Sequence, residues 1–308
     1  AIKSVDLIKG GFPARYGGRL SSVLEINMKE GNLKKYKIEG AMGIISAKIM
    51  VEGPIIKDKA SFIFAARRTY MDALLNPLLT ATRAQSEYTK QGYFFYDLNG
   101  KINYKISQKD RLYISAYTGK DAFYNNTKPY KYLYDGVVYT NESKDELTWG
   151  NALVAARWNH QFSDKHFSNV SLNYTRYNYN VLNYAKSSEN DGGDIVENLY
   201  YQSYITGIKD YTAKMDFDYL PNPNHYIKYG GSATWHRFSP GATTYKVKDI
   251  ALENPIDSTL GADNIMAMET AFYIEDDHKI NEKLKANYGL HYSSFLVKGK
   301  WYNSPQPR

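Results

Sequence analysis

The sequence predicts an all-β protein, a transmembrane antiparallel β-barrel with a short segment of different character ahead of it. From Tyr36 onward, apolar and polar residues alternate with a period of two, which is typical of strands with one dry and one wet face. The connections between these segments are short and long in turn, as in barrels with tight turns at one end and long loops at the other. No run approaches the ~18–20 apolar residues of a spanning helix, which excludes a helical membrane protein.

The composition narrows the class of protein further. Tyrosine is unusually frequent, with 30 residues, and suits a border where one end of a side chain is dry and the other wet. A Tyr-rich soluble β-protein or a sugar-binding surface would show the same excess. Cysteine is absent, which excludes a disulfide framework, Cys-ligated zinc and a thiol nucleophile. The net charge of +7 is spread along the chain without a Lys/Arg block and does not indicate nucleic-acid binding.

The N-terminal segment is rich in glycine. Ser4–Lys9 and Ser21–Lys29 are expected to form two short strands, and the linker between them holds the pairs Gly10-Gly11 and Gly17-Gly18. Glycine permits positive φ angles and close approach of the backbone to a neighbour. Neither phosphate-binding glycine motif is present and no helical pattern follows, so this linker does not indicate a phosphate site.

The alternation is clearest in residues 94–106, where aromatic and aliphatic side chains occupy one face and Lys, Asn and Asp the other. It recurs in residues 211–219, 227–236 and 284–293. A soluble sandwich would show the same alternation, with its apolar face inside. The loop lengths favour the barrel, because a sandwich has no reason to sort short and long connections to opposite ends.

About eleven strands are expected. They start near residues 36, 46, 60, 92, 110, 146, 166, 199, 225, 264 and 283. Short connections follow at 53–59, 107–110, 163–165, 221–224 and 281–283, and long polar loops are expected at about 69–90, 120–146, 186–202 and 239–264. Bacterial single-chain barrels have an even number of strands. The odd count therefore predicts that the chain stops partway round a barrel and that Arg308 is not the true C-terminus.

The segment Val5–Ile26 resembles the end of the plug domain in TonB-dependent outer-membrane transporters. The shared pattern is a hydrophobic–Lys–Gly segment, then Ala-x-Tyr-Gly, a small-residue turn and a final strand. Gly40–Lys48, Val51–Pro54 and Ala66–Tyr70 are similar to the first barrel strands of the Bacteroidota branch. The run Arg-Tyr-Gly-Gly-Arg-Leu-Ser-Ser looks closer to its carboxypeptidase-like-domain subgroup. The resemblance is specific over roughly the first 72 residues and architectural beyond them.

The resemblance implies a barrel of about 22 strands around a plug, of which this chain would hold about 11. Residues 1–33 would be the C-terminal end of the plug domain, and residues 34–308 the N-terminal half of the barrel. The implied function is TonB-dependent active transport of a bulky nutrient across the bacterial outer membrane. No enzymatic activity and no cofactor are expected. The implied partners are the TonB–ExbB–ExbD complex, membrane lipid and lipopolysaccharide, and a surface lipoprotein lid or other outer-membrane proteins, with no nucleic acid.

Two other functions stay open at this point. A barrel of the same build could serve as a structural or docking component of an outer-membrane complex. An outer-membrane phospholipase or protease is disfavoured, because such barrels are smaller and carry no plug.

The candidate functional residues are a plug motif and the charged residues that could meet it. The motif comprises Gly10, Gly11, Phe12, Pro13, Ala14, Arg15, Tyr16, Gly17, Gly18 and Arg19. A charge at the interface between plug and wall is costly without a partner. At least one of the two plug arginines is therefore expected to pair with a wall carboxylate. The candidate charge partners are Arg67, Arg68, Asp97, Asp216, Glu269 and Glu275.

Other polar clusters indicate no specific chemistry. The six histidines show no H-E-x-x-H motif and no i, i+4 pair, and are expected at strand ends or on polar faces. The acidic run Glu275–His278 is interpreted as a solvated rim or a partner of plug arginines, and Glu189–Asp194 as a solvated loop without the calcium-loop pattern. Tyr- and Asn-rich stretches such as Tyr124–Asn126 are expected to form girdles or loop packing, with sugar or peptide stacking as the alternative. No metal site and no catalytic residue is predicted, and the substrate-binding residues stay unknown.

Overall fold

The computed structural model describes residues 2–17, 22–82, 88–193, 195–249 and 254–308. A two-stranded hairpin, β1 (Ile2–Lys9) and β2 (Ser22–Met28), precedes a 13-stranded antiparallel sheet. The strands of the large sheet are β3 (Lys37–Met42), β4 (Ser46–Ile56), β5 (Ala60–Thr69), β6 (Thr89–Lys105), β7 (Asp110–Tyr134), β8 (Val137–Ser163), β9 (His166–Asn190), β10 (Ile195–Asn222), β11 (His225–Lys248), β12 (Ile256–Gly261), β13 (Ile265–Lys279), β14 (Lys285–Val297) and β15 (Lys300–Pro307).

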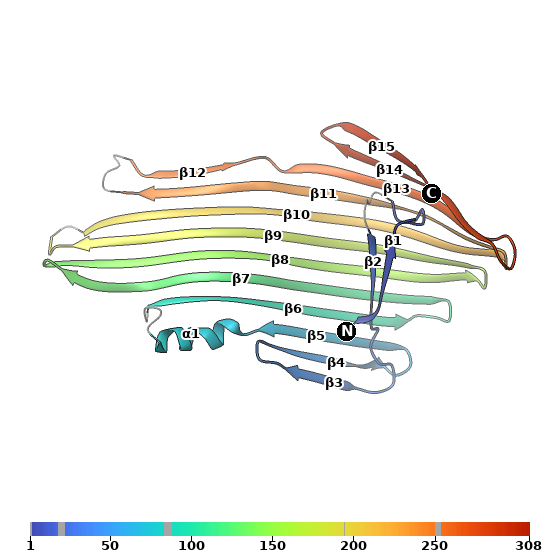
Figure 1. Ribbon diagram of the computed structural model, residues 1–308, viewed down its shortest axis with the longest axis horizontal. Coiled ribbons are helices and arrows are strands. Elements are labelled where there is room, and N and C mark those ends of the chain that lie inside the picture. The colour runs from blue at the N-terminus through green and yellow to red at the C-terminus, as the bar shows by residue number, and fades with distance from the viewer. Residues whose placement is uncertain (1, 18–21, 83–87, 194, 250–253) are drawn as a thin grey trace.

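The large sheet is a single layer in which strands adjacent in sequence are adjacent in space. Its order runs from β3 to β15, with β12 paired to the outer part of β11 and β13 paired to the rest of it (Figure 1). The apolar face is open, with Trp235 45% and Phe272 62% exposed. Within the described residues no second layer covers these side chains, so the fold is not a sandwich. The predicted all-β fold with an outward apolar face is confirmed.

The predicted long loops are a point of correction. Most of residues 120–146 and 186–202 belong to strands, because β7 to β10 are 25, 27, 25 and 28 residues long. A strand needs only about 9–11 residues to cross the bilayer. The extra length carries polar residues on both faces of the strands, as in residues 139–146. Alternation fades there, which is why the sequence pattern indicated loops.

Two connections on this side of the sheet are tight turns. Asp135 and Gly136 join β7 to β8 with φ angles of 49° and 82°, and Lys298 and Gly299 join β14 to β15 with 48° and 76°. Two consecutive positive φ angles are the signature of the type I′ hairpin turn. The strict alternation of short and long connections is therefore wrong, and the sheet contains thirteen strands, not eleven. The two missed strands are the short β12 and β15.

The stretch expected as a polar loop at about 69–90 contains a helix, α1 (Met71–Ala81). Arg68 forms an ion pair with Asp72 at 3.2 Å, across the start of this helix. Of the described residues, no helix is long and apolar enough to cross a membrane.

The hairpin of β1 and β2 lies across the strands of the large sheet, toward the end where the short turns gather (Figure 1). Its connecting loop reaches β13 and β14, and the segment after β2 reaches β5. The hairpin thus spans the width of the sheet on its polar face, and its contacts with that face form the candidate site.

Candidate functional site: the contact between plug loop and wall

The loop after β1, residues 10–17, is shaped for docking; we call it the plug loop. Gly10 and Gly11 have φ angles of 66° and 53°, which L-residues with side chains rarely adopt. The Tyr16 amide donates to the Pro13 carbonyl at 3.0 Å and closes a turn. This turn buries Phe12 and leaves Ala14 with no exposed surface. Residues 12–16 of the loop therefore form a compact turn that packs against the wall, and we call this turn the knob.

Glu275 of β13 receives this knob. Its side chain is almost completely buried, and its Oε2 accepts a hydrogen bond of 2.9 Å from the Arg15 backbone amide. The other carboxylate oxygen, Oε1, lies 3.6 Å from Lys228 Nζ, which also pairs with Asp277 at 2.9 Å. Burial of a carboxylate is costly unless its oxygens are paired. The knob supplies a hydrogen bond to Oε2, and Lys228 supplies opposite charge near Oε1, which has no hydrogen-bond partner among the described residues. Loss of the knob would therefore leave the charge poorly compensated.

The neighbouring strand β14 holds the knob from the other side. The buried ring of His291 donates from Nδ1 to the Ala14 carbonyl at 2.8 Å, which assigns its proton to that nitrogen. A Cβ atom at Gly17 would overlap the His291 ring, and one at Gly289 would lie 2.8 Å from the Ala14 Cβ. Two glycines, one on each partner, therefore permit the close approach of loop and strand.

The Arg15 side chain points into a polar cavity between hairpin and wall. The cavity has a volume of about 580 Å³ and is lined by the hairpin, including Glu25, and by wall residues such as Lys101, Arg157 and Asp216. Burial by itself lowers the pKa of the Arg15 guanidinium, but the negative groups around it outweigh this and raise the pKa above its ordinary value. The guanidinium is therefore charged, in a cavity that water can share.

A second contact ties the segment after β2 to the wall. The Ser61 hydroxyl of β5, which is fully buried, donates to the Glu30 carbonyl at 2.8 Å. Gly31 has a φ angle of 84°, and a Cβ atom there would lie 2.4 Å from the Phe62 carbonyl oxygen. Arg111 of β7 lies 3.8 Å from the Glu30 carboxylate. The hairpin is thus held near both edges of the large sheet, on β5 and on β13–β14.

The structure brings some of the predicted charge partners to the plug loop and leaves others in the wall. Glu275 contacts Arg15, but through the backbone amide. Among the described residues no carboxylate lies within 4.0 Å of the Arg15 guanidinium, so an ion pair of this arginine is not seen in this state. Asp216 lines the same cavity and accepts from Tyr273 at 2.6 Å. Gly18 and Arg19 lie outside the described residues.

The remaining candidates pair within the wall. Arg67 and Asp97 are cross-strand neighbours joined at 2.7 Å, and Arg68 pairs with Asp72 rather than with the hairpin. Glu269 lies 3.7 Å from His236 on the adjacent strand. These contacts stabilise strand pairing and the start of α1.

Sequence reasoning placed His291 and Gly289 on a polar face but assigned them no role. The sequence offered one signal for such a role, since both residues lie on the inward face of β14. Glycine there leaves room for a neighbouring segment, and histidine offers that segment a hydrogen-bond donor. Only the register between β13 and β14, with His291 opposite Tyr273 and Gly289 opposite Glu275, shows that they meet the same loop.

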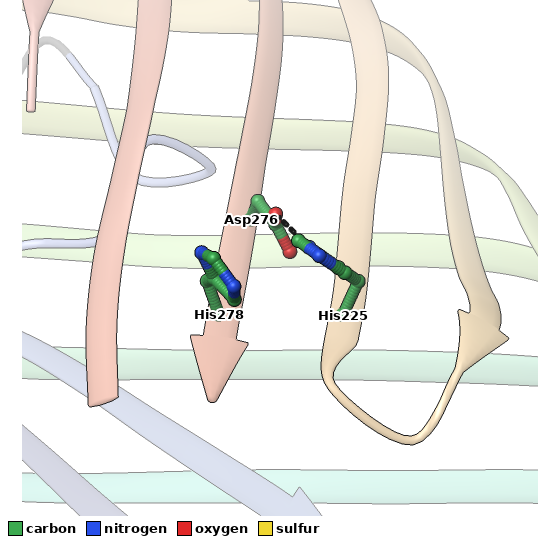
Figure 2. A group of neighbouring side chains, drawn as sticks. All are labelled: His225, Asp276 and His278. Atoms are coloured by element: carbon green, nitrogen blue, oxygen red, sulfur yellow. Dashed lines mark hydrogen bonds and ion pairs between the residues drawn. The ribbon is translucent and has the colours of Figure 1, made fainter. Parts of the chain in front are cut away.

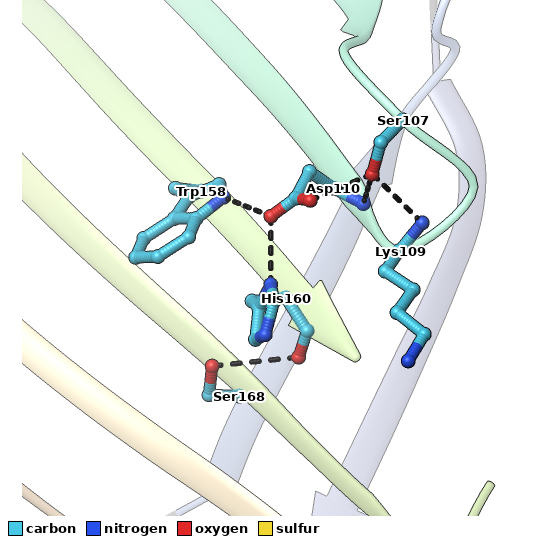
Figure 3. Close-up of polar contacts among 6 residues, drawn as sticks. All are labelled: Ser107, Lys109, Asp110, Trp158, His160 and Ser168. Carbon is cyan, nitrogen blue, oxygen red and sulfur yellow. Dashed lines mark hydrogen bonds and ion pairs between the residues drawn. The ribbon is translucent and has the colours of Figure 1, made fainter. Parts of the chain in front are cut away.

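Two further polar groups lie at the short-turn end of the apolar face. In the first, Asp110 accepts from Trp158 at 3.1 Å, from His160 at 2.7 Å and from Ser107 at 2.6 Å (Figure 3). The Ser107 hydroxyl also accepts from the Lys109 amide, and Ser168 donates to the His160 carbonyl. Both carboxylate oxygens are occupied, so this group is a closed hydrogen-bond cluster. The second group contains His225, Asp276 and His278 and is described below.

Tyrosines stack near the extended end of β7 and β8. The ring centroids of Tyr88 and Tyr130 are 5.4 Å apart, those of Tyr130 and Tyr132 6.1 Å, and those of Tyr132 and Tyr139 5.2 Å. Such a ladder offers flat aromatic faces to a ligand and also stiffens the strand ends.

Comparisons with known proteins show the fold. No family model matches the sequence, and no curated protein matches it. Among solved structures, the pyoverdine outer membrane receptor FpvA from Pseudomonas aeruginosa PAO1, bound to pyoverdine, matches with a TM-score of 0.58 at 13% identity, over 98% of this chain and 47% of that one. FpvA bound to a heterologous pyoverdine matches with a TM-score of 0.57 at 13% identity, over 98% and 43%.

The chain spans less than half the length of these receptors. Its single sheet, outward apolar face and inward hairpin are the fold of part of an outer-membrane receptor barrel.

Proposed function

We propose that this chain belongs to a plugged outer-membrane barrel that takes up a bulky nutrient by TonB-dependent active transport. Residues 1–33 act as the end of the plug and residues 34–308 as part of the barrel wall. The protein resides in the outer membrane, with its apolar face toward lipid and lipopolysaccharide and its polar face toward the lumen. It performs no covalent chemistry.

The observation that carries the proposal is the polar docking of the plug loop on the wall. The loop is held by the Glu275 carboxylate and the His291 ring, and the segment after β2 is held by the Ser61 hydroxyl, so polar contacts fix the hairpin on the wall at both edges. A neutral hydrogen bond contributes only about 0.5–1.5 kcal/mol net and one to a charged group about 1.5–3 kcal/mol, because water can replace the lost partner. Contacts of this kind block the lumen at rest and still allow the plug to move when it is pulled.

The energy for that movement would come from the TonB–ExbB–ExbD complex. The subgroup that best suits the N-terminal motif is the carboxypeptidase-like-domain subgroup of the Bacteroidota. A surface lipoprotein lid or another outer-membrane protein could cover the extended strand ends. The matched receptor, FpvA, is described with pyoverdine in both structures, in one as the iron complex, so ferric chelates are the first substrate class to test, followed by glycans, peptides and vitamins.

The test is growth and uptake in the native bacterium. A strain that lacks the gene is compared with the same strain carrying the full-length gene, on media with one ferric chelate, glycan, peptide or vitamin as the limiting nutrient. We expect the deletion strain to grow poorly on one nutrient. The full-length gene should restore this growth, and it should fail to do so in a strain that also lacks TonB. A strain that takes up every nutrient normally but loses a neighbouring outer-membrane protein would instead support a docking role.

A further inference from the structure

The second polar group on the apolar face brings together side chains from two strands. His225 begins β11, and Asp276 and His278 end β13, where His225 and His278 are directly paired neighbours (Figure 2). One nitrogen of each ring and one Asp276 oxygen all lie within 4.8 Å of one another. We propose that these three residues bind a divalent transition-metal ion of the zinc type. This proposal does not depend on the transport function.

The donor set suits such an ion. Imidazole nitrogen and carboxylate oxygen are zinc ligands at about 2.0–2.2 Å, and three protein ligands leave a fourth position for water. Two bonds of that length hold ligand atoms at most ~4.2 Å apart, so small rotations of the rings close the remaining distance. The His225 and His278 rings stack with centroids 4.1 Å apart, so the two imidazoles lie side by side.

The Asp276 carboxylate is incompletely paired without an ion. Its Oδ2 accepts from His225 at 2.6 Å and from the Tyr288 hydroxyl at 3.1 Å. Its Oδ1 is shielded from solvent and has no hydrogen-bond partner among the described residues. No lysine or arginine among the residues that the structure describes lies within 4.0 Å of this carboxylate. A buried orphan oxygen beside two histidines is the observation that points to a cation.

An outer ring of contacts is already in place. The Tyr288 hydroxyl of β14 lies 3.1 Å from Asp276 and 3.5 Å from His278 Nδ1, so it can orient both side chains. Such second-layer partners fix the direction of metal ligands. The side chains of His225 and Asp276 are 31% and 14% exposed, which lets an ion reach them from the membrane–water border.

The Asp110–His160 group shows what a plain hydrogen-bonded pair looks like at the same end of the sheet. Its two carboxylate oxygens are both occupied, and it offers one histidine (Figure 3). The bound ion would instead join β11 to β13 at the end of the sheet where each strand turns back to a different neighbour, β11 to β10 and β13 to β14. The site is therefore structural, tying together the ends of two hairpins.

The experiment uses the full-length protein in detergent, made without a polyhistidine tag and stripped with a chelator. Zinc is titrated by calorimetry and its stoichiometry measured by elemental analysis, and Co²⁺ is added separately to look for the visible absorption of a tetrahedral His-ligated site. We expect one ion per chain for the native protein. Loss of an outer partner costs about 10–100-fold in affinity, so Asp276→Asn and His278→Ala should weaken binding by at least that factor.

The control is His160→Ala, which removes a histidine from the closed pair and should leave zinc affinity unchanged. A shift in gel mobility between unheated and heated samples verifies that each variant forms its barrel. The proposal is overturned if the native protein binds no zinc, which would leave a hydrogen-bonded His–Asp pair only. It is also overturned if Asp276→Asn and His278→Ala bind zinc as tightly as His160→Ala.

Discussion

The contact between Glu275 and the Arg15 amide predicts a local loosening of the plug loop when the carboxylate is removed. In Glu275→Ala the amide loses its acceptor at 2.9 Å, and Lys228 keeps its ion pair with Asp277. A hydrogen bond to a charged acceptor is worth about 1.5–3 kcal/mol. Since 1.4 kcal/mol is a factor of ten, opening of the loop should become roughly 10–100-fold more frequent.

The assay is hydrogen exchange by mass spectrometry on the peptide that covers residues 12–17, in the full-length protein held in detergent. Exchange of a protected amide reports the free energy of local opening. We expect Glu275→Ala to speed exchange in this peptide by the factor above. Glu275→Gln keeps an oxygen that can accept the bond but lacks the charge, and should fall between the native protein and Glu275→Ala.

The matched control is Glu269→Gln, on the same strand and the same face. Glu269 contacts His236 at 3.7 Å, and no hydrogen bond joins it to the described residues of the plug loop. This variant should leave exchange in residues 12–17 unchanged. Native rates in Glu275→Ala would refute the reasoning, and so would equal acceleration in Glu269→Gln, because the effect would then belong to the wall as a whole.

Three further outcomes are expected. Gly289→Ala places a methyl group 2.8 Å from the plug loop and 2.5 Å from a backbone oxygen, and overpacking should lower the free energy of unfolding by about 1–3 kcal/mol, whereas Gly100→Ala, with open space around it, should be near neutral in the same urea titration. Ser61→Ala removes the 2.8 Å bond to the Glu30 carbonyl and leaves that oxygen without its donor, so proteolysis after β2 should accelerate by about fivefold, which corresponds to ~1 kcal/mol. Phe272→Lys, on the 62% exposed apolar face, should cost ~2–4 kcal/mol in a lipid vesicle, and a change within about 0.5 kcal/mol would show that this face meets water.

Much of the fold was readable because strand alternation is a local property. Each residue's face follows from its neighbours two positions away, so Phe217 and Trp235 could be assigned to the apolar face without knowledge of the rest of the chain. The pattern failed where a strand no longer has one apolar and one polar face. In the extended parts of β7 to β10 both faces carry polar residues, so alternation weakens and strands were mistaken for loops.

The candidate site was less accessible because it depends on contacts across the whole chain. The sequence indicated that a plug arginine would need a wall carboxylate and included Glu275 among the candidates. It could not show that the backbone of Arg15, 260 positions away, would provide the contact, or that Gly289 and His291 would complete it.

The alternating pattern alone thus determined which side of each strand is apolar, and the N-terminal motif indicated that a hairpin precedes the sheet. The tertiary structure decided which inward residues meet the hairpin and which outward residues meet one another. His225 reaches His278, and Asp276 lies beside both, only because β11 and β13 pair in one register. A shift of one residue would send those side chains to opposite faces, and register is set by the whole sheet and not by any single strand.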